Sequence, residues 1–277
     1  MNVFSSVFYI LACVAVIGCT NQQALPEANV QQQQPDKEGQ LETKNETEET
    51  ESPSAARPKT TAYRTAHPAP SAPSQHTEAE KIILDIPIIK QNPELKYGCE
   101  VTSLAMVLQH AGIKTNKMKL AREMPKDKDP VQKTAGGDIT RWGNPNHGFV
   151  GDITGQRAGY AIYAKPLEGL MRRYLPERTV NLTKQPFAIL LGQIRDGKPV
   201  IVWTTGDYKL PDRWESWKHG NEKITTPLDL HAVVLVGYDK EHVYLNDPLT
   251  GKKAQMTDRN TFIQSWKALG HQALSYR

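Results

Sequence analysis

A long polar tract near the N-terminus leaves only the rest of the chain available for a folded domain. Residues 21–80 are rich in Gln, Glu, Thr, Pro and Ser and contain almost no large apolar side chains. A segment of this composition buries too little apolar surface to offset the entropy lost on ordering. We therefore expect a disordered polar linker over residues 19–80 and one folded domain over residues 81–277, long enough to bury a sizeable core.

The first residues form a separate apolar segment. Residues 3–18 are too few for a comfortable bilayer span and end in small side chains, which predicts a signal peptide over residues 1–18. The sequence VIGC at 16–19 resembles the bacterial lipobox, and the resemblance implies that Cys19 carries a diacylglycerol. Because no Lys or Arg precedes the apolar run, an uncleaved membrane anchor is the alternative. We expect a lipid-anchored protein on the extracellular side of the bacterial cytoplasmic membrane, or else a secreted or N-terminally anchored one.

Composition excludes several classes of protein. Three cysteines are far fewer than a disulfide-stabilised scaffold needs. The formal net charge is only +4, and no run of Lys and Arg is interleaved with aromatic residues, so we expect no nucleic-acid partner. Neither a Walker motif nor a GxGxxG motif occurs, and we predict no cofactor.

The folded part has helical signals first and strand signals later. In residues 99–111 apolar side chains recur on one face at helical spacing, and Gly112 is placed to end that helix. The other expected elements are helices at 166–175 and 186–197 and strands at 81–91, 198–206, 230–239 and 242–248. This order, with short hairpins, predicts an α+β fold with an antiparallel sheet.

Cys99 lies at the predicted N-terminus of the first of these helices. A thiolate is the nucleophile in cysteine chemistry, and both the positive end of a helix and a neighbouring imidazolium lower a thiol pKa. If Cys13 leaves with the signal and Cys19 is lipidated, Cys99 is the only free thiol of an exported protein. A buried cysteine that acts as a small apolar side chain is the alternative.

His231 is the histidine best placed to act with Cys99. It begins an apolar strand, where a polar ring needs a partner. If the next hairpin turns at Asp239, His231 and Asp247 lie equally far from the turn (239 − 231 = 247 − 239) and face each other on adjacent strands. Opposed Cβ atoms are then about 4.5–5.5 Å apart, close enough for a carboxylate to bond an imidazole. A two-residue turn would shift this register by half a position.

A thiol on a helix N-terminus and a base oriented by a carboxylate are typical of nucleophilic acyl transfer. The Cys99 backbone N–H can supply one donor for the oxyanion of the tetrahedral intermediate. Gln91 could supply a second through its side-chain amide. Taken alone, however, Gln91 fits better as a solvated glutamine before a loop.

Four blocks carry a family resemblance. In this order, KQNPELKYGCEVTSLAMVL, WGNPNHGFVGD, HAVVLVGYD and YLNDP resemble papain-like cysteine peptidases related to the bacteriocin-leader (double-glycine) peptidases, specifically their exported stand-alone branch. The resemblance spans residues 82–255 and implies a papain-like fold with the cysteine helix against an antiparallel sheet. It implies Cys99 as nucleophile, His231 as general base and then acid, Asp247 as the residue that orients the imidazole, and Gln91 as oxyanion donor. The implied activity is cleavage of peptide or isopeptide bonds in a peptide or protein substrate.

Two departures limit what the resemblance implies. The bacteriocin-exporter enzymes have Asp-Cys-Gly around the nucleophile, whereas this chain has Gly98, Cys99 and Glu100, so cleavage after a double glycine is not expected. Asn246 is an alternative to Asp247 as the residue that orients the histidine. The functional alternatives are another acyl transfer on the same triad, such as amidation, transpeptidation or ester cleavage, and a catalytically silent module that binds peptide or cell-wall material.

A glycine-rich loop at 134–155 has no helical or strand period. We expect it to line a peptide cleft together with tryptophans from later segments. The expected lining residues are Trp142, Asn144, Asn146, Trp203 and Trp214. A metal site in this loop would use Asp138, His147 and Asp152, but these residues lack a recognised ligand spacing, so we predict no metal.

Overall fold

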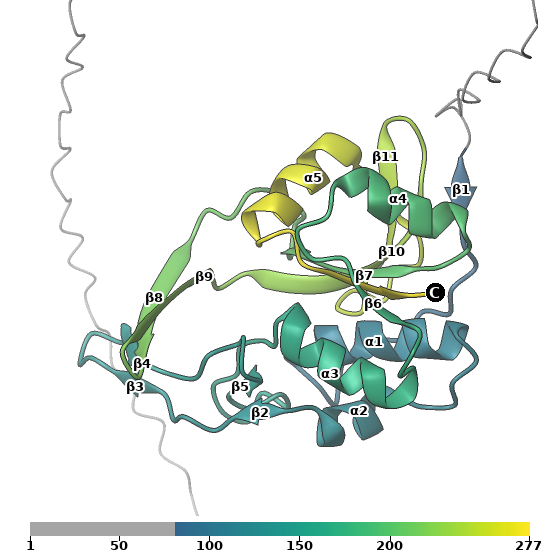
Figure 1. Ribbon diagram of the computed structural model, residues 1–277. Helices are drawn as coiled ribbons and strands as arrows, with labels where there is room; N and C mark the ends of the chain where they lie inside the picture. Colours follow the sequence, from purple (N-terminus) through teal and green to yellow (C-terminus); the bar gives the residue numbers. More distant parts are fainter. Residues whose placement is uncertain (1–80) are drawn as a thin grey trace, which may run out of the picture. The chain divides into compact units, whose positions relative to one another are not determined.

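The computed structural model describes residues 81–277 (Figure 1). The expected signal peptide (1–18), the expected lipidation site Cys19 and the expected linker (19–80) lie outside the described residues. Within residues 81–277, no helix is both long enough and apolar enough to cross a bilayer.

A seven-stranded sheet organises the domain. Its strands follow the order β12, β11, β10, β7, β13 and β6, with β1 paired to β10, and every pair is antiparallel. The strands are β1 (Ile82–Ile83), β6 (Thr179–Asn181), β7 (Val200–Thr205), β10 (Leu230–Tyr238), β11 (His242–Asn246), β12 (Gln255–Asp258) and β13 (Ala273–Tyr276).

Helices cover both faces of this sheet (Figure 1). On one face lie α1 (Cys99–His110), α2 (Lys117–Glu123) and α3 (Ala164–Tyr174), and on the other lie α4 (Phe187–Arg195) and α5 (Arg259–Ala268). Alternate side chains of β10 enter the two cores, because successive residues of a strand point to opposite faces. Ala232 and Val234 pack in the core with α1 and α3, whereas Val233 and Leu235 pack in the core with α4 and α5. The predicted α+β fold is confirmed.

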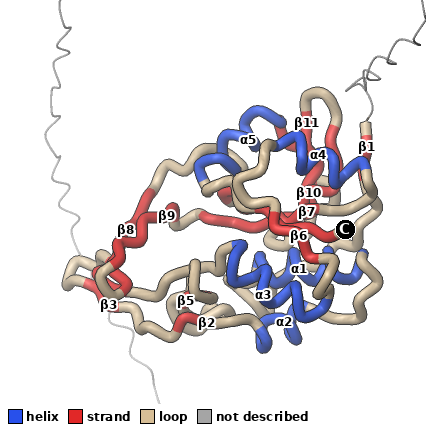
Figure 2. Tube along the Cα trace, viewed as in Figure 1, coloured by secondary structure: helices blue, strands red, loops and turns tan. Residues whose placement is uncertain are grey.

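Two smaller sheets extend from the main body (Figure 2). One is the parallel pair of β2 (Lys126–Asp127) and β5 (Phe149–Val150). The other contains β3 (Gln132–Lys133), β4 (Ile139–Arg141), β8 (Trp214–His219) and β9 (Glu222–Pro227). The indole N–H of Trp217 donates to the Gly143 carbonyl at 2.8 Å. The glycine-rich loop is therefore fastened to the β8–β9 hairpin.

Most of the expected elements are present, and one is largely wrong. The expected helix at 99–111 is α1, and Gly112 follows it with φ of 86°. The strand expected at 81–91 pairs only at Ile82 and Ile83. After Leu84 donates a last hydrogen bond to Val236, the chain leaves the sheet.

Candidate active site

Cys99 is the first residue of α1, and its position depends on Gly98. A Cβ atom on Gly98 would lie 2.5 Å from the Cβ of Leu95, so only glycine fits this turn. Because Gly98 makes no side-chain cap, the N–H groups of the first helical turn keep their donor capacity. The buried Cys99 sulfur accepts a hydrogen bond from the backbone N–H of Ala232, and the Ser103 hydroxyl, one helical turn later, donates to the Ala232 carbonyl at 3.2 Å.

His231 immediately precedes Ala232, so the thiol and the imidazole come from backbones in direct contact. The His231 Nε2 atom lies 2.7 Å from the Asp247 Oδ1 atom, and both side chains are buried. This bond occupies Nε2, so Nδ1 is the ring nitrogen that remains for proton exchange with another group. The helix that begins with Cys99 therefore contacts the strand that carries His231, and His231 in turn bonds Asp247.

The hydrogen bond between His231 and Asp247 is as expected, but the expected register is wrong. The ladder pairs Val234 with Asn246 and, beyond a bulge, Tyr238 with Val243. The turn lies at Lys240 and Glu241, later in the chain than assumed, so Asp247 lies diagonal to His231, beyond the paired part of the hairpin. The offset is two residues and preserves the face on which the side chains lie, which explains why they still meet.

Asp247 is held by donors that the sequence did not reveal. Its carboxylate accepts hydrogen bonds from the Tyr208 hydroxyl at 2.9 Å, the Thr250 hydroxyl at 2.8 Å and the Leu249 backbone N–H at 2.8 Å. Burial favours the neutral acid, but the hydrogen bonds from His231, Thr250 and Leu249 outweigh it and lower the pKa of Asp247 below its ordinary value. The carboxylate is therefore ionised and fixed in orientation.

Asn246, the alternative to Asp247, points elsewhere. Its side-chain amide donates to the Ile86 carbonyl at 3.1 Å, and its side-chain carbonyl accepts from the Ala254 N–H at 2.9 Å. The Asn246 side chain therefore joins the segments around Ile86 and Ala254. The carboxylate next to it is the group that bonds the histidine.

Gln91 lies between the two segments that carry Cys99 and Asp247. Its backbone N–H donates to the Pro248 carbonyl at 2.8 Å, and its side-chain Nε2 donates to the Lys96 carbonyl at 2.8 Å. Its Oε1 atom is buried with no hydrogen-bond partner. The residue is buried rather than solvated, and the second hydrogen of Nε2 remains available as a donor.

Glu100 is a buried acid next to the thiol, and its place in the site was not predicted. Its Oε2 atom accepts a hydrogen bond from the Cys99 thiol at 3.3 Å, and its Oε1 atom accepts the Ile162 N–H at 2.9 Å. Burial raises the pKa of Glu100 to about 7. The sequence did contain one signal for this role: a charged side chain at the second position of an otherwise apolar helix face.

The expectation of a lowered thiol pKa is not met. Burial, and next to it the Glu100 carboxylate, raise the pKa of the Cys99 thiol, and these effects exceed that of the Ala232 N–H. The sulfur is therefore a neutral thiol at rest. To act as a nucleophile it must lose its proton during attack, a step that a general base performs.

The three principal residues expected to line a peptide cleft are buried. Trp203 has no exposed surface, and its indole N–H donates to the Ile162 carbonyl at 3.1 Å. Trp142 packs against Tyr160 and Trp217. The Asn144 amide donates to Glu222 at 2.9 Å. Trp142 packs in the small core next to the glycine-rich loop and Trp203 in the core with α1, so the expected apolar wall is not exposed at Trp142, Asn144 or Trp203.

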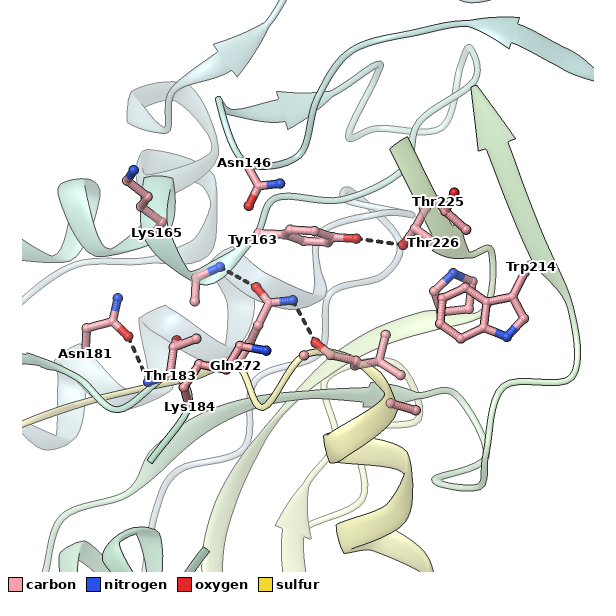
Figure 3. A pocket seen from close by; sticks show the side chains of 15 residues that line it. Asn146, Tyr163, Lys165, Asn181, Thr183, Lys184, Trp214, Thr225, Thr226 and Gln272 are labelled. Carbon is pink, nitrogen blue, oxygen red and sulfur yellow. Dashed lines mark hydrogen bonds between the residues drawn. The ribbon is translucent and has the colours of Figure 1, made fainter. Parts of the chain in front are cut away.

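A pocket of about 510 Å³ lies between α3, β9 and the turn after α5 (Figure 3). Trp214, half exposed, and Asn146 both line it, as do Tyr163, Lys165 and Gln272. None of Gln91, Cys99, His231 and Asp247 is among its lining residues. The pocket is thus distinct from the cluster around the thiol.

The metal site considered from the sequence does not form. Asp138 bonds within its own turn to Thr134, and Asp152 accepts hydrogen bonds from Thr154 and Arg157. Both carboxylates serve the local turns of the glycine-rich segment. His147 instead meets residues outside that segment.

The helix that begins with a thiol, packed on an antiparallel sheet that carries an imidazole and a carboxylate, defines the class of papain-like cysteine peptidases. A model of the Peptidase_C39-like family matches residues 83–274. The chain belongs to this family.

Two similar proteins extend the comparison. The uncharacterized protein YvpB of Bacillus subtilis (strain 168) is 38% identical over 182 residues, which are 66% of this chain and 70% of YvpB. The crystal structure of a candidate C39-like peptidase from Bacillus anthracis is 42% identical, with a TM-score of 0.65, over 72% of this chain and 98% of that one.

Proposed function

We propose that this chain is an exported cysteine peptidase that cleaves peptide or isopeptide bonds through Cys99, His231 and Asp247. The observation that carries the proposal is the 2.7 Å bond between His231 and Asp247, next to a thiol on the first turn of α1. Family membership supports peptidase activity in general.

The proposed reaction proceeds in two halves. The Cys99 thiol gives its proton to His231 Nδ1 while the sulfur attacks the substrate carbonyl carbon, and the oxyanion accepts hydrogen bonds from the Cys99 N–H and the Gln91 amide. The C–N bond then breaks, and the leaving amine takes the proton from His231. Water, deprotonated by His231, attacks the thioester and releases the acid and the free thiol.

Turnover of a peptide library, followed by mass spectrometry, tests this proposal. The chain should release defined fragments, and Cys99→Ala should release none. Glu241→Gln, in the exposed turn between β10 and β11, should stay active and serves as the control. Unchanged turnover by Cys99→Ala would refute the assignment. Added amines separate hydrolysis from transfer, because a transferase would incorporate them into the product.

We also propose that the protein is held at the extracellular side of the bacterial cytoplasmic membrane by lipid on Cys19. The signal-like segment and the VIGC sequence support this location. Cys19→Ser should move the protein out of the membrane fraction, whereas Cys13→Ser should leave it there. A Cys19→Ser chain that stays in the membrane would point to an uncleaved anchor instead.

A further inference from the structure

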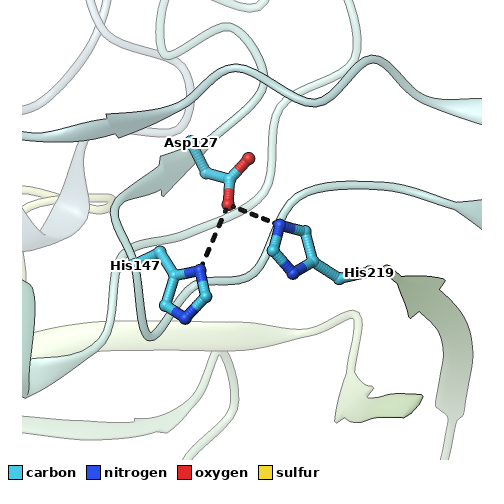
Figure 4. Close-up of side chains that lie close together, drawn as sticks. All are labelled: Asp127, His147 and His219. Atoms are coloured by element: carbon cyan, nitrogen blue, oxygen red, sulfur yellow. Dashed lines mark ion pairs between the residues drawn. The ribbon is translucent and has the colours of Figure 1, made fainter. Parts of the chain in front are cut away.

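Away from the thiol, two histidines converge on one carboxylate. Asp127 ends β2, His147 lies in the turn before β5, and His219 ends β8. The His219 Nε2 atom is 3.0 Å and the His147 Nδ1 atom is 3.8 Å from the Asp127 Oδ2 atom. Figure 4 shows both rings turned toward this oxygen. One ligand atom from each of the three residues lies within 4.8 Å of the other two.

The carboxylate at the centre is held in place before any ligand binds. The Asp127 side chain is only 7% exposed. Its Oδ2 atom accepts the Asn144 N–H at 3.1 Å, and its Oδ1 atom accepts the Asp129 N–H at 3.0 Å. A Cβ atom on Gly143 would lie 3.0 Å from the Asp127 carboxyl carbon, so the loop packs directly against the acid.

The backbone also fixes the two histidines. His219 pairs with Glu222 at the end of the β8–β9 hairpin, and the Trp217 indole joins that hairpin to Gly143. His147 donates its backbone N–H to the Asn144 carbonyl at 2.9 Å. The two rings meet edge to face with centroids 5.0 Å apart. Three segments distant in sequence therefore present their donors to a common point.

The distances suit a shared ion better than hydrogen bonds alone. The 3.8 Å separation of His147 from Asp127 is too long for a hydrogen bond. Two ligands on one tetrahedral zinc ion, each about 2.0–2.1 Å from the metal, lie about 3.3 Å apart, and 3.0 and 3.8 Å fall on either side of that value. Two imidazoles and one carboxylate suit Zn²⁺, whereas Ca²⁺ and Mg²⁺ favour oxygen ligands.

We propose that Asp127, His147 and His219 bind one zinc-type divalent cation. Asp129 can add a fourth ligand, because its Oδ2 atom lies 3.4 Å from His219 Nε2 and its side chain is exposed. The ion cross-links β2, the turn before β5 and the end of β8. It is separate from the thiol chemistry, whose residues it does not use.

Zinc content, measured on the full chain, tests the proposal. Because thiols bind zinc, all variants carry Cys13→Ser, Cys19→Ser and Cys99→Ala, and no histidine tag. After removal of metal with a chelator, exposure to Zn²⁺ and gel filtration, elemental analysis should find one zinc per chain. His147→Ala and His219→Ala should lose it. The His147 side chain is 58% exposed, so its removal leaves the fold intact, as circular dichroism will verify.

Two other histidine–aspartate pairs provide matched controls. His242→Ala removes a ring 3.2 Å from Asp239, and His231→Ala removes the ring that bonds Asp247. Both variants should keep their zinc. The proposal is overturned if the chain does not bind one equivalent of zinc, or if His147→Ala and His219→Ala still bind it. Loss of zinc in His231→Ala would also overturn it.

Discussion

At the scale of single residues, the protonation of the Cys99 thiol depends on the adjacent Glu100. The thiol donates a hydrogen bond to the Glu100 carboxylate. Glu100 raises the pKa of Cys99 through its negative charge, and the Glu100 pKa of about 7 places its own ionisation near neutral pH. Cys99 reactivity should therefore depend on Glu100 as well as on His231.

Replacement of Glu100 by Gln should lower the thiol pKa. The amide keeps the shape of the side chain and can still accept the Ile162 N–H, but it carries no charge. The rate of Cys99 alkylation by iodoacetamide, measured against pH, should rise at lower pH in Glu100→Gln than in the unaltered chain. The exposed Glu241→Gln should leave the profile unchanged. A profile that does not move, or moves to higher pH, contradicts the assigned role of Glu100.

Asp247→Asn should reduce kcat/KM for a peptide substrate by about 10²- to 10⁴-fold, because an amide cannot stabilise the imidazolium as a carboxylate does. Asp239→Asn is the control, since Asp239 lies 3.2 Å from the ring of another histidine, the half-buried His242. The measurement is steady-state hydrolysis of a substrate found by the library screen. Equal losses in both variants would contradict a specific role for Asp247.

At the scale of elements, the sequence predicts best where burial imposes a simple period. The apolar face of residues 99–111 identified α1, and unbroken apolar runs identified β7 and β10. No element was predicted for β8 and β9, because each buries only one large apolar side chain, Trp217 and Ile224, which is too few to establish an alternation. In α5 only Phe262 and Trp266 mark the buried face as large apolar side chains, too few to establish a helical period.

The site was predicted in part for the same reason. His231 and Asp247 flank strong strand patterns, so their spacing alone indicated the hydrogen bond that joins them. Tyr208 and Thr250 reach Asp247 from turns, and the cluster of Asp127, His147 and His219 joins three separate segments. Such contacts depend on tertiary packing, which no local period encodes.

The cap of α2 provides a test at this scale. The Asn116 side chain accepts the Lys119 N–H at 2.9 Å and so satisfies one of the free donors of the helix N-terminus. Asn116→Ala should lower the free energy of unfolding by about 1 kcal/mol, measured by urea denaturation. Asn116→Asp retains an acceptor and should cost much less. Equal stability of the alanine variant and the unaltered chain would contradict the capping role.

At the scale of the whole molecule, one buried acid should make stability depend on pH. The folded state holds the Glu100 proton up to a pKa of about 7, whereas the unfolded chain releases it near the ordinary value of 4.5. Between these two pH values the folded state binds more protons than the unfolded chain. The contribution of Glu100 to stability is therefore greatest below pH 4.5 and falls as the pH rises toward 7.

The size of this effect can be measured by difference. The rise of the Glu100 pKa from 4.5 to about 7 corresponds to a change of about 3 kcal/mol in the free energy of unfolding. The free energy of unfolding of Glu100→Gln, relative to the unaltered chain, should therefore rise by up to about 3 kcal/mol between pH 4.5 and 7. The Glu241→Gln variant should show no such trend. A constant difference between Glu100→Gln and the unaltered chain over this range would contradict burial of an ionisable acid.

The convergence of thiol, imidazole and carboxylate is tested most directly by the rate at which a peptidyl thiol-directed acyl probe labels Cys99. The chain used has Cys13 and Cys19 replaced by serine, so that Cys99 is its sole thiol. Labelling should be fast in this chain, at least tenfold slower in Asp247→Asn and slower still in His231→Ala, by about 10²-fold or more. Equal labelling rates in all three chains would show that the sulfur reacts without the other two groups.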